Sequence, residues 1–191
     1  VLIEKLIELQ VRPNIINLII SFLNERSHST KTLGLVSEFL SITCGVPQGT
    51  CSGPRLFVIL VNGKWCPFVS YTKFMDDKTL SYSYKGDPTE VLQKALDIEE
   101  EGTKKDKMII NASKCHAITF NFSEKNKPPR NLTLAGNTIE NVDEIKLLGV
   151  TITSDLKWSK NTQNICDKVS QKFYILSKLK KFGLEIDELV V

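Results

Sequence analysis

The helical segments of this chain are marked by apolar residues that recur at spacings of three and four. This pattern predicts amphipathic helices over residues 2–9, 13–24 and 87–102. It also predicts a lysine-rich amphipathic helix over residues 159–181. The apolar run 55–61 fits either a helix or a buried strand, because its hydrophobicity has no period that separates the two.

Residues at the helix ends support these boundaries. Pro13 suits the first turn of a helix, and Asp87 followed by Pro88 is typical of a helix start. We expect that helix to end near Gly102, with residues 99–101 exposed. Gly183 is expected to end the lysine-rich helix, and residues 184–191 to begin another.

Between the helices, alternating and β-branched segments predict strands. Hairpins are expected over residues 28–43, 66–84 and 132–139, and single strands over 116–122 and 144–152. The last strand has Gly149 in its middle. A glycine there costs stability and often marks a bulge or a close approach by another chain.

Length and composition are those of a globular protein. The 191 residues, 41% of them hydrophobic, fit one large domain or a domain with a small appendage. We see no apolar run long enough to cross a bilayer and no secretory signal, and the first residue is Val1, which suggests a fragment of a longer chain. The five cysteines are scattered without a Cys-x-x-Cys pair, which favours reduced thiols in an intracellular protein, cytoplasmic and nuclear.

Positive charge is concentrated near the end of the chain. The net charge is +3, but residues 159–181 hold six lysines and one acid, so this segment carries +5 and the remainder −2. Such a helix points to phosphate backbones or to an anionic surface. A solvated lysine-rich face is an equally simple interpretation.

The most distinctive chemistry is the stretch Phe74-Met75-Asp76-Asp77, which we expect at or beside a hairpin turn. Two carboxylates a few ångströms apart repel each other unless a cation lies between them. Mg²⁺ prefers oxygen ligands of this kind. The alternative is an ordinary solvated turn, because Asp is a common turn residue.

A second candidate is the loop that contains Pro47, Gln48 and Gly49. Gly45 and Gly49 allow the backbone to approach a ligand closely, and Gln48 can both donate and accept a hydrogen bond. The alternative is a plain connection between two elements.

Taken in order, four motifs resemble the reverse transcriptase of non-LTR (LINE-type) retrotransposons. They are Gly45-Val46-Pro47-Gln48-Gly49-Thr50, Phe74-Met75-Asp76-Asp77, Asn111-Ala112-Ser113-Lys114-Cys115 and Lys146-Leu147-Leu148-Gly149-Val150. The resemblance implies an α+β fold, the right-hand polymerase palm, in which helices cover one face of an antiparallel sheet. It places the palm in residues 1–158 and the start of a helical thumb in residues 159–191.

The same resemblance implies a nucleotidyltransferase that uses two metal ions, Mg²⁺ or alternatively Mn²⁺. It implies an RNA template, a DNA primer and deoxynucleoside triphosphates as partners, and no membrane. By this resemblance Asp76 and Asp77 would hold the metals, and Lys114 would be a candidate general acid near the pyrophosphate. The resemblance also implies roles for three further groups of residues. The nucleotide and the template would be contacted by Phe74, Pro47, Gln48 and Gly49. The primer grip would contain Leu148 and Gly149, and the nucleic-acid backbone would be contacted by Lys178, Lys180 and Lys181.

Departures from that family shape the expected activity. The family's third catalytic aspartate lies upstream of the first helices seen here, and Lys78 stands where a small polar residue is usual. We therefore expect little or no polymerase activity from these 191 residues alone. The alternatives are a non-catalytic nucleic-acid-binding remnant and a decayed pseudogene product.

Overall fold

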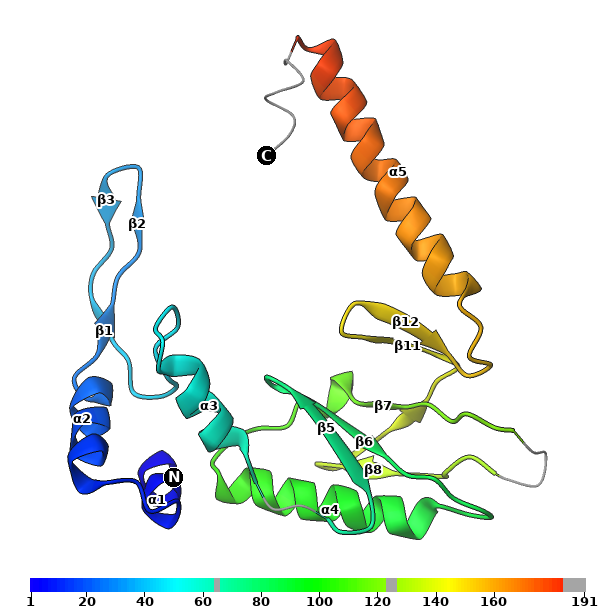
Figure 1. Cartoon of the computed structure of the whole chain (residues 1–191), viewed down its shortest axis with the longest axis horizontal. Helices are drawn as coiled ribbons and strands as arrows, with labels where there is room; N and C mark the ends of the chain where they lie inside the picture. Colours follow the sequence, from blue (N-terminus) through cyan, green and yellow to red (C-terminus); the bar gives the residue numbers. More distant parts are fainter. Residues whose placement is uncertain (64–65, 123–126, 184–191) are drawn as a thin grey trace. The chain divides into compact units, whose positions relative to one another are not determined.

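The computed structural model of the chain describes residues 1–63, 66–122 and 127–183 (Figure 1). The chain divides into two compact units. The first contains residues 1–83 and 94–110, and the second contains residues 84–93 and 111–191. Helices and small antiparallel sheets are mixed along the chain, so the α+β class is confirmed. The palm and thumb boundary expected at residue 158 stays a prediction.

Four helices contribute to the first unit. They are α1 (Leu2–Glu8), α2 (Pro13–Leu23), α3 (Gly53–Val61) and α4 (Thr89–Lys105), the last from residue 94 onward. Helix α1 contacts both α2 and α3, and its Leu6 is almost fully buried. Pro13 occupies the first turn of α2, as predicted. The run 55–61, which fitted two structures, lies within helix α3.

Two hairpins complete this unit. In the first, β1 (Ser27–His28) pairs with β4 (Leu40–Ser41), and β2 (Lys31–Thr32) pairs with β3 (Leu35–Val36) across a turn that contains Gly34. In the second, β5 (Ser70–Phe74) pairs with β6 (Asp77–Ser81). Both hairpins were predicted from the sequence.

Within its described residues, the second unit has short strands and one long helix. Its elements are the 3₁₀ turn η1 (Ala112–Lys114), β7 (His116–Ala117), β8 (Thr133–Leu134), β9 (Asn137–Thr138), β10 (Glu140–Asn141), β11 (Glu144–Leu147), β12 (Val150–Thr153) and α5 (Ser159–Lys181). Strands β8 and β9 form the predicted hairpin over residues 132–139. Strand β7 pairs with β10 in parallel.

Three expectations from the sequence were wrong in detail. Residues 144–152 form two strands joined by a turn, because Leu148 and Gly149 both adopt positive φ angles that end β11. The predicted strand 116–122 is limited to His116 and Ala117. Helix α4 continues past Gly102 to Lys105. Glu99 and Glu100, which were expected to be exposed, are half-buried: Glu99 pairs with Lys78 of the β5–β6 hairpin, and Glu100 with Lys104 on the same helix.

The lysine-rich helix is confirmed over Ser159–Lys181, but it buries no residue. The apolar stripe was expected to contain Val169, Phe173, Leu176 and Leu179. The first three are exposed, and Leu179 is half-buried. Residues 184–191, where a further helix was expected, lie outside the described part of the chain. Among the helices that the structure describes, none combines the length and apolar character that a membrane span requires.

Candidate active site

The paired aspartates lie at the tip of the β5–β6 hairpin. Phe74 is opposite Asp77 in the ladder, so Met75 and Asp76 form the two-residue turn. Met75 has a φ of +53°, in keeping with the positive φ that tight hairpin turns require at their first central residue. Both carboxylates are exposed. The prediction that Asp76 and Asp77 lie at or beside a hairpin turn is confirmed.

Side-chain alternation gives this hairpin two different faces, because successive residues of a strand point to opposite sides. The outer face consists of Ser70, Thr72, Phe74, Asp77, Thr79 and Ser81. The inner face consists of Tyr71, Lys73, Lys78 and Leu80. Inner-face residues are all half-buried, whereas five of the six on the outer face are exposed. The Asp77 carboxylate is therefore on the accessible side.

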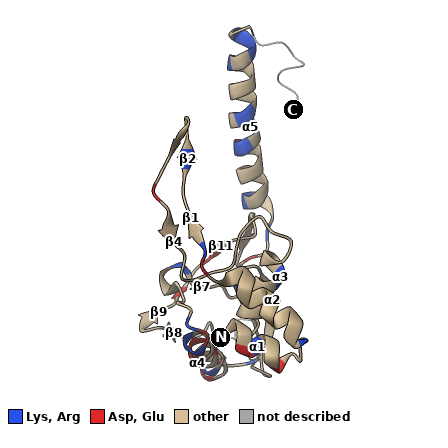
Figure 2. Ribbon diagram, turned by 90° about the vertical axis from the view of Figure 1, so that its left-hand side faces the viewer, with Lys and Arg blue, Asp and Glu red and all other residues tan. Residues whose placement is uncertain are grey.

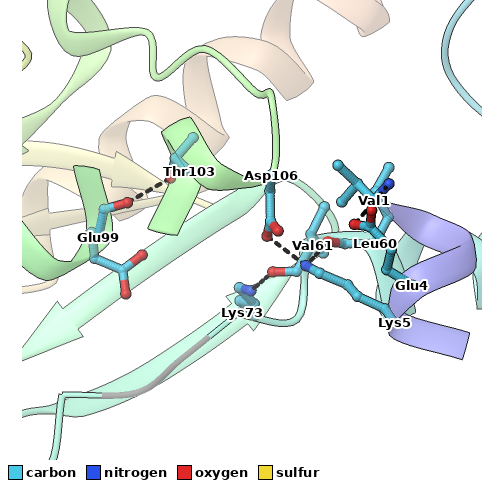
Figure 3. Close-up of polar contacts among 9 residues, drawn as sticks. All are labelled: Val1, Glu4, Lys5, Leu60, Val61, Lys73, Glu99, Thr103 and Asp106. Carbon is cyan, nitrogen blue, oxygen red and sulfur yellow. Dashed lines mark hydrogen bonds and ion pairs between the residues drawn. The ribbon is translucent and has the colours of Figure 1, made fainter. Parts of the chain in front are cut away.

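The two inner-face lysines have partners on neighbouring helices. Lys73 Nζ donates a hydrogen bond to the carbonyl of Val61, at the end of α3 (Figure 3). Lys78 forms an ion pair with Glu99 of α4, and its ammonium lies 4.4 Å from the centroid of the Tyr71 ring. The pKa of Lys73 is lowered, mainly by burial and next by the positive charge of Lys78 across the ladder.

A third lysine ties the first helix to the same region. Lys5 Nζ donates to the Leu60 carbonyl at 2.5 Å and to Asp106 Oδ2 at 2.5 Å (Figure 3). The last carbonyls of a helix lack partners within the helix and carry partial negative charge. Lys5 and Lys73 satisfy two of them at the end of α3. Helices α1 and α3 and the chain after α4 are thereby fixed around the base of the hairpin.

The loop before α3 is held by its own hydrogen bonds. Thr50 Oγ1 donates to the Pro47 carbonyl at 3.2 Å and accepts from the Gly53 N–H at 3.0 Å. Gly53 is buried, and a Cβ at this position would lie 2.2 Å from the Pro47 carbonyl oxygen. Gly45 and Gly49 have φ angles of +76° and +74°, which favour glycine at both turns. The loop therefore has one defined shape.

The template-binding candidates lie in this loop. Gln48 and Gly49 are exposed and Pro47 is half-buried. The start of the loop is fixed by Arg26, whose Nη2 donates to the Gly45 carbonyl at 2.7 Å. Gln48 is accordingly presented to solvent from a backbone that is anchored at both ends.

Lys114, the candidate general acid, is the exposed last residue of η1 in the second unit. The turn before it contains a hydrogen bond from Ser113 Oγ to Asn111 Oδ1 at 2.7 Å. Cys115 follows, and burial raises the pKa of its thiol. The predicted primer-grip residues, Leu148 and Gly149, form the exposed turn of the β11–β12 hairpin.

Strand β12 also fixes the start of the basic helix. The N–H of Thr151 donates to Asn161 Oδ1 at 3.0 Å, and Asn164 Nδ2 donates to Thr151 Oγ1 at 3.0 Å. Thr151 is 5% exposed, so both bonds lie where water does not compete. All six lysines of α5 are exposed, and lysines appear as blue bands along the helix in Figure 2.

The chemistry of the hairpin tip fits a hard divalent cation, because two carboxylates offer oxygen ligands to solvent. The fit is partial: within the described residues no group of three or more His, Cys, Asp or Glu side chains could hold a metal ion. Asp76 and Asp77 thus supply two carboxylates.

The predicted site residues fall into two groups by unit. The hairpin tip and the Pro47–Gly49 loop belong to the first unit, whereas Lys114, the turn at Leu148 and the lysines of α5 belong to the second.

The chain matches a known protein family over most of its length. Residues 2–152 match the family of reverse transcriptases (RNA-dependent DNA polymerases), which covers well over half of the chain. The chain belongs to the reverse transcriptase family. This reverse transcriptase segment contains the hairpin, the Pro47–Gly49 loop and Lys114, but ends before α5.

Several curated relatives are polymerases of mobile elements. The chain is 26% identical over 189 residues to the RNA-directed DNA polymerase from mobile element jockey of Drosophila melanogaster, across 90% of this chain and 20% of that protein. The jockey protein of Drosophila funebris gives 26% identity over 91% of this chain and 20% of its own length. The probable RNA-directed DNA polymerase from transposon X-element of Drosophila melanogaster gives 26% identity over 86% and 19%. The chain thus spans about a fifth of the length of these relatives, and no solved structure matches it.

Sequence reasoning missed several residues that support the candidate site of this member of the reverse transcriptase family. Thr50 and Gly53 shape the loop, and Lys73 and Glu99 hold the inner face of the hairpin. The alternation of side chains along a strand places positions 71, 73, 78 and 80 on one face of the hairpin. That pattern could have identified Lys73 and Lys78 as inner-face residues. Nothing in the sequence marks Glu99 among its acidic neighbours, because its partner lies 21 positions away.

Proposed function

We propose that this chain is part of the palm of an RNA-directed DNA polymerase, with the lysine-rich segment from residue 159 onward as the start of its thumb. The observation that carries the proposal is the exposed carboxylate pair at a hairpin tip within a segment that matches reverse transcriptases. Its substrates are a DNA primer, an RNA template and deoxynucleoside triphosphates. The names of the relatives support the same activity.

In this proposal Asp76 and Asp77 hold Mg²⁺, or Mn²⁺ in its place. Such ions, when bound, lower the pKa of the primer 3′ hydroxyl and neutralise charge on the leaving pyrophosphate. The hairpin contributes rigidity: its ladder fixes the backbone on both sides of the turn, and the outer face keeps the Asp77 carboxylate in contact with solvent. Binding the ions in a fixed place is the task of this pair.

Other residues have roles in positioning and proton transfer. Gln48 and Gly49 contact the template and the incoming nucleotide from an anchored loop, and Phe74 contacts the nucleotide from the outer face beside Asp77. Lys114 donates a proton toward the pyrophosphate. The Leu148–Gly149 turn holds the primer, a role that its exposure supports.

A primer-extension assay tests the polymerase function. We expect little or no extension by the 191 residues on an RNA template with Mg²⁺ or Mn²⁺, because the described residues supply two carboxylates to the metal site. Robust extension that Asp76→Ala abolishes would show that the site is complete after all.

Metal binding can be measured without turnover. Mn²⁺ broadens nuclear magnetic resonance signals close to it, so titration of the 191-residue chain should selectively broaden amide signals of residues 74–78. The double variant Asp76→Asn/Asp77→Asn should lose that effect while keeping the hairpin. Broadening that is unchanged in this variant would refute the proposed metal site.

A second candidate function is binding of nucleic acid without catalysis. The observation that favours it is helix α5, which exposes all six of its lysines and buries no residue. A long cationic surface of this kind attracts phosphates independently of sequence. Lys178 Nζ also lies 5.4 Å from the centroid of the Tyr174 ring, which places an aromatic surface beside the charge.

Salt dependence of duplex binding tests this candidate. Replacing Lys178, Lys180 and Lys181 with Gln should reduce the slope of log affinity against log salt by roughly 2–3, because each phosphate contact contributes about 0.9. The matched control replaces the exposed residues Lys31, Lys85 and Lys127 with Gln, which removes the same charge elsewhere. Equal losses in both variants, or no duplex binding at low salt, would refute a specific role for α5.

A further inference from the structure

Lys78 directly follows the paired aspartates, and its position raises an electrostatic problem. A lysine has a long flexible stem and a compact charge. If the ammonium were free, it would be drawn to two exposed carboxylates within a few ångströms of its own backbone. It would then occupy the place that the proposed function gives to a metal ion.

In the structure, the Lys78 ammonium is held elsewhere. The side chain leaves β6 on the inner face, opposite Lys73, whereas Asp77 lies on the outer face opposite Phe74. The Lys78 ammonium forms an ion pair with Glu99, and the side chains of the two residues are only 22% and 14% exposed. A pair with so little exposure is screened much less than one at the surface.

Tyr71 fixes the other side of this ion pair. Its ring lies 4.4 Å from the Lys78 ammonium, within the range of a cation–π contact. Its hydroxyl oxygen accepts the N–H of buried Cys66 at 3.0 Å, and the hydroxyl also hydrogen-bonds with Glu99. The Lys78 ammonium, the Tyr71 ring and the Glu99 carboxylate therefore form one connected group on the inner face of the hairpin.

Glu99 offsets positive charge on the inner face of the hairpin. Lys73 and Lys78 are direct neighbours across the ladder, and like charges in this position repel. Lys73 is bound to the neutral carbonyl of Val61. Glu99 reaches this face from α4 and pairs with Lys78. The negative charges of Glu99 and Asp106 also act on Lys73.

We propose that Glu99 is a positioning residue that holds Lys78 on the inner face and so keeps the Asp76 and Asp77 carboxylates open to a divalent cation. This inference rests on the proposed function of the aspartates. By this inference, the ability of the hairpin to bind a cation depends on Glu99, which does not itself contact the metal.

Charge variants of the 191-residue chain test the inference by Mn²⁺ titration, with broadening of the amide signals of residues 74–78 as the measure. Glu99→Gln frees the lysine and should weaken the apparent Mn²⁺ affinity about fivefold, the effect of one unit charge at close range in a partly screened setting. Lys78→Met should leave the affinity unchanged or raise it. The double variant Glu99→Gln/Lys78→Met should return to the wild-type value.

A purely structural ion pair predicts the opposite pattern: Lys78→Met would weaken Mn²⁺ binding as much as Glu99→Gln, and the double variant would show no recovery. Either result overturns the inference. The matched control is Glu100→Gln, which removes the same charge one residue further along α4, where the carboxylate pairs with exposed Lys104. An equal fivefold loss in this control would also refute a specific role for Glu99.

A metal-independent measurement separates this inference from the proposed function. Protons next to the Lys78 ammonium should show an upfield ring-current shift from Tyr71, which Glu99→Gln removes and Glu100→Gln preserves. A normal shift in the wild-type chain, or a shift that persists in Glu99→Gln, overturns the inference even if Mn²⁺ binds. A different result would be the expected ring-current shifts together with no Mn²⁺ binding in any variant. This result would refute the metal site and the metal-related part of the inference. The restraint of Lys78 by Glu99 would stand.

Discussion

The interaction between Lys5 and Asp106 provides a quantitative test of how the base of the hairpin is held. Lys5 Nζ contacts both Asp106 Oδ2 and the Leu60 carbonyl, each at 2.5 Å. The Lys5 and Asp106 side chains are 16% and 10% exposed. Lys5→Met keeps most of the stem but removes the charge, which leaves a nearly buried carboxylate and a helix-terminal carbonyl without this donor.

The magnitude follows from the burial of the pair. Removing one partner of a fully buried ion pair costs about 3–5 kcal/mol, and an exposed pair contributes at most about 1 kcal/mol. With both side chains mostly buried, we expect Lys5→Met to lower the free energy of unfolding by about 2–3 kcal/mol. Asp106→Asn should cost less, about 1–2 kcal/mol, because Lys5 keeps the Leu60 carbonyl.

Urea unfolding of the whole chain, followed by far-ultraviolet circular dichroism, measures both variants and their combination. Because the two residues are in contact, the double variant should cost about as much as Lys5→Met alone. Losses that add to within about 0.5 kcal/mol would refute the coupling. The control is Lys104→Met, which breaks an i,i+4 pair within one helix whose lysine is 73% exposed, and it should cost less than about 0.5 kcal/mol.

Three further predictions concern single positions. Gly53→Ala should destabilise the chain by at least about 2 kcal/mol in urea unfolding and perturb the amide signals of residues 47–50, because the new Cβ meets backbone at 2.2 Å. Leu148→Asn should stabilise the β11–β12 hairpin by about 0.5–1 kcal/mol, since Leu148 has a φ of +48° and Asn-Gly suits this turn. The pKa of Asp155 is lowered to about 2, chiefly by its hydrogen bond from Thr153. Its stabilising contribution is present above its ordinary pKa of 3.8 and is lost as pH falls through about 2, so the Lys157 amide signal should titrate near pH 2 and not in Asp155→Ala.

Much of the local structure could be predicted from the sequence because it depends on local rules. Helix α4 begins where expected because Asp87 Oδ1 accepts the Thr89 N–H at 2.9 Å, the interaction that the Asp87-Pro88-Thr89 pattern indicates. The β5–β6 hairpin was found for a similar reason, since alternation and a short polar turn determine it.

The errors arose where a distant partner or a backbone angle decides the structure. Leu148-Gly149 was interpreted as the middle of a strand, because a leucine gives no sign that it adopts a positive φ. Glu99 was expected to be exposed because three consecutive glutamates usually form a solvated face. Its burial depends on Lys78, 21 positions earlier in the chain, and no local pattern indicates that contact.

The candidate site residues and the residues that support them differ in how they are arranged along the sequence. The carboxylates, the loop glycines and Lys114 form short contiguous motifs, which a resemblance can detect residue by residue. The residues that hold these motifs in place come from separate elements: Lys5 from α1, the Leu60 carbonyl from α3 and Glu99 from α4. They are defined by packing in three dimensions and have no fixed spacing in the sequence.

The register of the β5–β6 ladder links these two sets of residues. With Phe74 opposite Asp77, the carboxylate faces solvent and the neighbouring lysine faces Glu99. A slip of one residue in a strand moves every side chain to the other face. Such a slip in β6 would turn Asp77 toward the inner face and expose Lys78 beside Phe74, which exchanges an accessible carboxylate for an accessible cation. The ion pair between Lys78 and Glu99 opposes that slip, because it forms only when Lys78 is on the inner face. The contact that keeps the lysine away from the aspartates therefore also favours the register that exposes them.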